Sequence, residues 1–163
     1  MSRRRLVPLR ALLVAGLLSA ATPAATPAEI GAFLSGADPG ESWGTGWGGT
    51  LTITLFNLVG GELEGAWQPS ELPSTSLFTL SAKAYIGPSF GRLVPYGGIG
   101  AGVYRESVLG DSDTGTLGQL FVGLKLKFTI GLVVRGELQW VDLPTPAPVD
   151  LDHRYFIGLG LAF

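Results

Sequence analysis

The chain has no cysteine, and it has a single histidine among its 163 residues. The absence of cysteine excludes a disulfide framework and a lipoprotein attachment site. The sequence also has no cluster of histidine, cysteine and carboxylate residues of the kind that holds a transition metal. We therefore expect neither a metal nor a cofactor.

Long hydrophobic runs are missing beyond the N-terminal region, although 46 % of the residues are hydrophobic and the mean hydropathy is +0.36. No later segment approaches the roughly 20 apolar residues that a transmembrane helix needs. The chain also contains 25 glycines and 11 prolines, both of which are unfavourable inside helices. Apolar residues dispersed in this way are typical of β-strands, so the composition predicts an all-β protein.

Basic residues are scarce outside the first ten positions. The formal net charge is −2, and removal of the four arginines near the N-terminus lowers it to −6. The chain therefore has no basic surface for nucleic acid, and we expect no such partner. Closely spaced glycines at 98–102 and 158–160 do not precede a helix, so they do not indicate a nucleotide site.

The N-terminal region has the organisation of a secretory signal peptide. A cluster of arginines comes first: Arg3, Arg4, Arg5 and Arg10. The apolar run 11–21 follows, and small residues then permit cleavage after Ala21, Ala24 or Ala28. We expect a signal peptide at 1–24, with cleavage as late as 28, and a single barrel domain at 25–163. A membrane anchor is disfavoured because the run is shorter than the roughly 20 residues that span a bilayer.

The last segment, 153–163 (HRYFIGLGLAF), alternates as a strand between two different surroundings does. Small or polar residues stand at Arg154, Gly158, Gly160 and Ala162, and the alternate positions form one apolar set: Tyr155, Ile157, Leu159, Leu161 and Phe163. A final strand of this kind with a terminal aromatic resembles the signal that the barrel-assembly machinery of the outer membrane reads. We expect that machinery to be a partner during biogenesis.

The sequence from residue 29 divides into eight alternating segments, each near the ~9 to 11 residues that a tilted strand needs to cross a bilayer. We predict strands at 29–36, 46–56, 60–68, 76–86, 93–105, 116–128, 131–141 and 153–163. These segments predict an eight-stranded antiparallel up-and-down transmembrane β-barrel with its apolar face toward lipid. A soluble lipocalin-like binder is the alternative, and the positions of the charges disfavour it. Because lipid-exposed sheet edges are not tolerated, the last strand must pair with the weak strand around Ile30 to Leu34.

The predicted connections alternate in length. Short periplasmic turns are expected at 57–59, 87–92 and 129–130, and longer outer loops at 37–45, 69–75, 106–115 and 142–152. The outer loops hold most of the acids: Asp38, Glu41, Glu71, Glu106, Asp111, Asp113, Asp142, Asp150 and Asp152. One hypothesis is that divalent cations bridge some of them to lipopolysaccharide phosphates. Ordinary solvated loop charge is the favoured interpretation, with outer-membrane lipid and lipopolysaccharide as the surrounding partners.

The alternation also predicts two sets of side chains. Aromatic residues at strand ends on the lipid side predict an interfacial girdle, with Trp47, Trp67, Phe78, Trp140 and Tyr155 at outer ends and Phe128 and Phe163 at inner ends. Charged residues of the opposite parity predict a lumenal network: Glu62, Glu64, Lys83, Lys125, Lys127, Arg135, Glu137 and Arg154. Eight strands enclose a lumen that side chains can fill, so we expect ion pairs and not a diffusion pore; a proton or ion path is the alternative.

Three glycines, Gly98, Gly100 and Gly102, share the parity of the lumenal charges. They would leave room for long side chains from neighbouring strands, or they would serve strand curvature. The sequence leaves both interpretations open.

The segment Tyr85 to Tyr104 (YIGPSFGRLVPYGGIGAGVY), with its Pro-Tyr pair and these glycines, resembles the central hairpin of the small OmpA-like and OmpX-like outer-membrane barrel family. With the terminal strand, the resemblance covers essentially the whole mature chain. It implies an eight-stranded barrel in the outer membrane of a Gram-negative bacterium. For function it implies membrane integrity, adhesion or surface contact.

A lipid hydrolase, similar to the barrel enzymes that deacylate lipid A, is the second function class. It would use the single histidine, His153, which follows Asp152 at the outer end of the last strand, and it would need a serine within hydrogen-bond reach. The expected lipid-side neighbours, Leu34 and Trp140, are not serines, and Ser35 has the opposite parity. We therefore predict no catalytic residue and a monomeric barrel with a structural or surface-interaction role.

Overall fold

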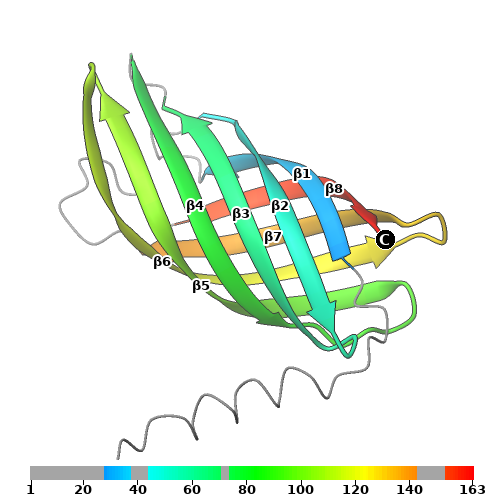
Figure 1. Cartoon of the computed structure of the whole chain (residues 1–163). Helices are drawn as coiled ribbons and strands as arrows, with labels where there is room; N and C mark the ends of the chain where they lie inside the picture. Colours follow the sequence, from blue (N-terminus) through cyan, green and yellow to red (C-terminus); the bar gives the residue numbers. More distant parts are fainter. Residues whose placement is uncertain (1–27, 38–43, 71–73, 143–152) are drawn as a thin grey trace, which may run out of the picture.

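The computed structural model describes residues 28–37, 44–70, 74–142 and 153–163, which form a closed barrel of eight antiparallel strands (Figure 1). The strands are β1 (Ala28–Ala37), β2 (Gly46–Leu55), β3 (Val59–Pro69), β4 (Thr75–Ile86), β5 (Leu93–Val108), β6 (Asp111–Lys127), β7 (Leu132–Asp142) and β8 (His153–Ala162). Each strand pairs with its neighbours in the chain, and β8 pairs with β1. The predicted eight-stranded up-and-down barrel is confirmed. The predicted signal peptide lies outside the described residues, which include no helix long and apolar enough to cross a membrane.

The ring closes between β1 and β8. Ile30 lies opposite Leu161, and Leu34 lies opposite Ile157. At the end of this seam Ala28 and Phe163 exchange two backbone hydrogen bonds, with N···O distances of 3.1 and 2.9 Å. Closure satisfies the main-chain groups that would otherwise face lipid. The predicted pairing of the last strand with the weak first strand is therefore confirmed.

Strand alternation separates an apolar outer face from a lumenal face. On β8, the side chain of Ile157 is 70 % exposed, whereas those of its neighbour Phe156 and of Arg154 are buried in the lumen. The same alternation places large apolar residues of all eight strands on the outside. A continuous exposed apolar surface of this kind matches the lipid-facing band of a transmembrane barrel.

The expected outer loop at 106–115 is wrong, because β5 and β6 continue through it as one long hairpin. Only Leu109 and Gly110 connect the two strands, with φ angles of +52° and +98°. Positive φ at both central residues is typical of the type I′ turn, which matches the twist of a hairpin. The polar residues that suggested a loop are held in a ladder: Arg105 lies opposite Thr114, and its guanidinium donates to Ser112 Oγ at 3.2 Å. We call residues 105–115 the outer hairpin.

In five cross-strand pairs an aromatic ring covers the glycine opposite it: Phe33 and Gly48, Tyr155 and Gly36, Tyr85 and Gly60, Tyr96 and Gly123, and Tyr104 and Gly115. A Cβ added to any of these glycines would lie only 2.2 to 2.7 Å from an atom of the facing ring. The ring therefore occupies the space that a side chain would fill and covers the glycine.

The inward glycines of β5 serve two purposes. A Cβ on Gly98 would lie 2.0 Å from the Ala84 carbonyl oxygen, so the backbones of β4 and β5 approach too closely for a side chain. A Cβ on Gly100 would instead lie 2.7 Å from Gln119 Nε2 and 3.0 Å from Lys83 Cγ. Close approach of the two backbones explains the first glycine, and room for long side chains explains the second.

Candidate functional site: the lumenal charges and the lipid-facing wall

Six charged side chains of inward parity meet in the middle of the lumen. This central cluster consists of Glu62, Glu64, Lys83, Arg135, Glu137 and Arg154. The Lys83 ammonium lies 2.6 Å from Glu137 Oε1 and 3.3 Å from Glu62 Oε1, and it also contacts Glu64. Three carboxylates thus meet three cations, and the cluster as a whole is neutral.

The two arginines reach across the barrel to the carboxylates of β3. Arg135 on β7 binds both carboxylate oxygens of Glu62, at 2.6 and 3.0 Å, and its Nη2 also donates to Glu137 Oε2 at 2.7 Å. Arg154 on β8 pairs with Glu64. Bidentate pairing of a guanidinium with a carboxylate is strong and geometrically specific. These contacts link β3 to strands that are not its neighbours in the sheet.

Neutral polar groups occupy further hydrogen-bond positions of the cluster, although the buried Arg135 Nε has no partner among the described residues. Gln139 Nε2 donates to Glu64 at 2.9 Å and to Glu137 at 2.6 Å, and its oxygen accepts from Arg154 Nε at 2.8 Å. Tyr96 donates to Glu137 at 2.7 Å, and Thr52 donates to Glu62 at 2.8 Å. Such partners reduce the large cost of taking charges out of water. Gln139 has the inward parity that marks the charges, and Tyr96 shares the parity of the inward glycines of β5, so the alternation could have identified both.

Aromatic rings pack against the cations of the cluster. Phe33 and Phe156 stack with ring centroids 4.4 Å apart. The Arg135 guanidinium carbon lies 4.8 Å from the Phe156 centroid, and Lys83 Nζ lies 4.8 Å from that of Phe121. Ring faces attract cations and contribute apolar volume that excludes water.

The other two predicted lumenal charges lie nearer the end that carries the short turns. Lys125 pairs with Glu29 of β1 at 2.9 Å, outside the central cluster. Lys127 is half-buried, and no ion pair joins it to another described residue. A cavity of about 10 Å³ is lined by these three side chains, which leaves room for about one water molecule.

The predicted girdle residues lie on the lipid side of the barrel. Their exposed fractions range from 37 % to 77 %: Trp47, Trp67, Phe78, Phe128, Trp140, Tyr155 and Phe163. Trp47 and Trp67 form a cross-strand pair with ring centroids 6.2 Å apart. The apolar residues of the predicted assembly signal, Tyr155, Ile157, Leu159, Leu161 and Phe163, face outward as well. Sequence reasoning did not single out Phe56 and Phe90, which are exposed in the short turns.

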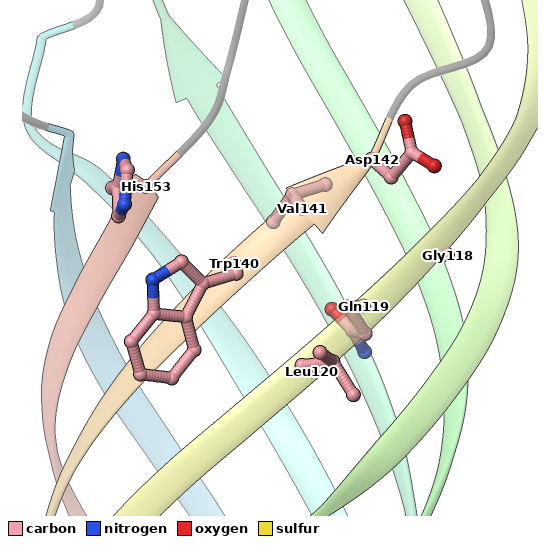
Figure 2. Close-up of a pocket in the computed structure, with 7 residues that line it drawn as sticks. All are labelled: Gly118, Gln119, Leu120, Trp140, Val141, Asp142 and His153. Atoms are coloured by element: carbon pink, nitrogen blue, oxygen red, sulfur yellow. The ribbon is translucent and has the colours of Figure 1, made fainter.

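His153 lies at the start of β8, beside a shallow hollow in the lipid-facing wall (Figure 2). It lies opposite Trp140, and the two rings are 6.3 Å apart at 70°. The hollow has a volume of about 490 Å³ and is lined by Gly118, Gln119, Leu120, Trp140, Val141, Asp142 and His153. None of these residues is a serine, and Ser35 is buried on the lumenal side of β1. The described lining therefore offers His153 no nucleophilic hydroxyl.

Four of the acids expected in outer loops, Glu106, Asp111, Asp113 and Asp142, lie in strands instead. The other five, Asp38, Glu41, Glu71, Asp150 and Asp152, lie outside the described residues. Glu106 faces Asp113 across the outer hairpin, and burial together with the Asp113 charge raises the pKa of the Glu106 carboxyl. In the described part of the chain, no three histidine or acidic residues are grouped to hold a metal ion.

No protein-family model matches the chain, and no curated protein matches it in sequence. Solved structures match nearly the whole barrel. The N-terminal β-barrel domain of Pseudomonas aeruginosa OprF is 21 % identical, with 85 % of this chain and 98 % of that chain covered and a TM-score of 0.58. Neisserial surface protein A is 11 % identical, with 84 % of this chain and 94 % of that chain covered and a TM-score of 0.62. Ail, the attachment invasion locus protein of Yersinia pestis, is 19 % identical, with 85 % of this chain and 99 % of that chain covered and a TM-score of 0.51. None of the three is named as an enzyme.

Identities this low establish the fold alone, and the fold agrees with the surface of the molecule. Where all eight strands pair, the closed ring has no free strand edge that lipid could contact. Every strand carries exposed apolar side chains on the outside of this ring. The chain therefore has the fold of these small eight-stranded outer-membrane β-barrels, with the OmpA-like architecture that its sequence resembles.

Proposed function

We propose that this protein is a non-enzymatic structural barrel with a closed lumen, and not a diffusion pore. The central cluster is the observation that carries the proposal. Its members come from β3, β4, β7 and β8, and their side chains are at most 2 % exposed. A solute crossing this level would have to separate several charge-assisted hydrogen bonds at once.

The aromatic contacts support the same proposal. Phe33, Phe156 and Phe121 are buried in the lumen and pack close to the charged groups. Together with the ion pairs they leave little room for a continuous file of water. A lumen of eight strands is narrow enough for side chains to fill it.

Conductance and solute uptake test this proposal directly. Purified protein would be reconstituted in planar bilayers and in liposomes loaded for osmotic swelling. We expect the wild type to show neither channel steps nor swelling with small sugars, and Arg135→Ala to show conductance because it removes three charge-assisted contacts. Lys127→Ala, at the mouth and outside the central cluster, is the matched control and remains closed. Steady conductance by the wild type would overturn the proposal.

We also propose that the outer hairpin contacts a partner at the cell surface. In Figure 1 the yellow-green hairpin of β5 and β6 extends past the end of β7 (orange). Among the described residues, Asp111 to Leu117 of β6 pair only with β5, because pairing with β7 begins at Gly118. A free strand edge is a site where an extended peptide can add to a sheet. Leu109, at the tip, is 79 % exposed.

Shortening the outer hairpin tests this second role. Residues 106–113 would be replaced by an Asn-Gly turn, which closes a two-residue hairpin. We expect the barrel to keep its heat-modifiable migration on gels while cells that display it lose adherence to host cells or matrix proteins. Undiminished adherence by a folded, shortened barrel would remove the outer hairpin from any contact role.

A further inference from the structure

Two adjoining hollows cross the lipid-facing wall between β5 and β8. The first is the hollow beside His153, and the second, of about 580 Å³, is lined by Gly97, Gly98, Leu120, Phe121, Val122 and Trp140. Both are bordered by Leu120 and Trp140, which lie opposite each other on β6 and β7. We call the two together the wall groove.

Missing side chains create the wall groove. Gly118 faces the lipid side, and a Cβ added there would meet no other atom within 4 Å. Gly97 also lacks a side chain on β5, opposite Val122 of β6, but the space there is narrower, since an added Cβ would lie 3.3 Å from the Phe121 carbonyl oxygen. From Gly118 to Val122 the groove follows four residues of strand, about 13 Å. This length and its apolar floor suit one stretch of a lipid acyl chain.

The end of the wall groove nearest the outer hairpin is polar. Figure 2 shows Asp142 at the end of β7 and His153 at the start of β8, with Trp140 and Leu120 below them. Asp142 is exposed, and His153 is half-buried against the Trp140 ring. A carboxylate therefore faces the lipid headgroup region together with an imidazole, which can donate a hydrogen bond in either protonation state.

The charges at this end favour a particular headgroup. The described lining contains no lysine or arginine, and Arg154, the residue after His153, faces the lumen and pairs with Glu64. Lipid A phosphates would meet Asp142 without a cation to bind them, whereas a headgroup with one ammonium and one phosphate has a partner for each.

We propose that the wall groove binds a zwitterionic aminophospholipid, and this goes beyond the structural role of the barrel. One acyl chain lies along Leu120 and Trp140, from the gap at Gly118 toward Gly97. The ammonium group pairs with the Asp142 carboxylate. The phosphate accepts a hydrogen bond from His153.

Native mass spectrometry of the detergent-purified protein tests the proposal by competition among phosphatidylethanolamine, phosphatidylglycerol and lipid A. We expect the ethanolamine lipid to be retained about tenfold more than the glycerol lipid, the effect of one charge-assisted hydrogen bond. Asp142→Asn, a neutral change of the same shape at an exposed site, should abolish this preference. Retention of all lipids alike by the wild type, or preferred retention of lipid A, would overturn the assignment.

A second variant tests the acyl-chain site separately. Gly118→Leu fills the gap and should lower the retention of both phospholipids while the barrel still shows heat-modifiable migration. Gly65→Leu on β3 is the matched control, because it is another lipid-facing glycine whose added Cβ would meet only Leu80 Cδ1, at 4.0 Å. It should leave retention unchanged. Equal retention by the two leucine variants contradicts the proposed position of the chain, and if Gly118→Leu does not fold, Asp142→Asn still decides the headgroup.

Discussion

The lumen and the lipid-facing wall are built from the same strands, but their side chains depend on their surroundings in different ways. On β3, Glu62 and Glu64 are buried in ion pairs, whereas Leu63 between them is 53 % exposed on the wall. In the lumen each charged group of the central cluster depends on particular partners. On most of the wall, away from the wall groove, side chains need only be apolar, since lipid adapts to their shape. A slip of one residue in pairing would exchange the two faces, so the register is strongly specified.

Removing the Lys83 ammonium from the central cluster should have the largest effect on the stability of the barrel. Lys83→Met leaves three buried carboxylates with one cation fewer, and we expect it to lower the free energy of unfolding by about 3–5 kcal/mol. Urea unfolding in lipid vesicles, followed by tryptophan fluorescence, measures the change. Lys127→Met, at the mouth of the lumen, is the control and should cost less than about 1 kcal/mol. Equal losses in the two variants would show that the central cluster does not stabilise the barrel.

Placing a charge on the wall should have the next largest effect. Leu63→Lys moves an ammonium group into lipid beside the level of the central cluster, where it should cost about 2–4 kcal/mol. The same unfolding experiment measures the loss. Leu63→Met, which keeps the position apolar, is the control. A lysine tolerated as well as methionine would mean that this surface is not in contact with the hydrocarbon core.

Two glycines of β3 allow the lumen and the wall to be compared with smaller expected changes in stability. Gly60→Ala would place a Cβ 2.2 Å from the ring of Tyr85 in the lumen, and overpacking of this kind costs about 1–3 kcal/mol. Gly65→Ala, five residues along on the wall, meets only Leu80 Cδ1 at 4.0 Å and should be nearly neutral. Chemical denaturation of both variants in the same vesicles decides between them. The comparison fails if the wall variant is the less stable of the two.

The smallest expected change in stability comes from ionisation of the Glu106 carboxyl in the outer hairpin as the pH rises. Its pKa is raised in the folded protein by burial and by Asp113, so the folded state holds the proton more tightly than the unfolded state does. Stability from this group is therefore greatest below the ordinary glutamate pKa and is lost as the pH rises through the raised value. Hydrogen-exchange protection of the hairpin amides, corrected for intrinsic rates, should fall slightly over that range. Glu106→Gln should remove the dependence.

Alternation was sufficient to predict the number of strands, their faces and the closing partner of the last strand. It placed Glu62, Glu64, Lys83, Arg135, Glu137 and Arg154 on the lumenal side, but it did not indicate which carboxylate meets which cation. Lys83 reaches Glu137, 54 residues away and on a strand that is not a neighbour of β4. That contact depends on the tilt and stagger of the closed barrel, which a single strand does not encode. The pairing of Tyr85 with Gly60 depends likewise on the register between strands.

The loop predicted at 106–115 was wrong because it was inferred from the polar residues of the outer hairpin. Residues such as Ser112, Asp113 and Thr114 are typical of loops, but beyond the membrane a hairpin need not alternate between apolar and polar faces. Its strands are held by backbone pairing and by a turn at Leu109 and Gly110 that fits their twist. The turn places Leu109, a non-glycine residue, at positive φ, which is uncommon, and no sequence pattern predicted it.

The geometry of the central cluster has a mechanical consequence. In a ring of eight strands β3 lies diametrically opposite β7, and β4 lies opposite β8. Arg135 joins the first of these pairs through Glu62, and Arg154 joins the second through Thr79 Oγ1, at 3.3 Å. Flattening the ring along one diameter must lengthen the perpendicular one, so these cross-links resist a change from a round to an oval cross-section. The barrel therefore behaves as a stiff inclusion, and lateral pressure in the surrounding membrane deforms the lipid before it deforms the protein.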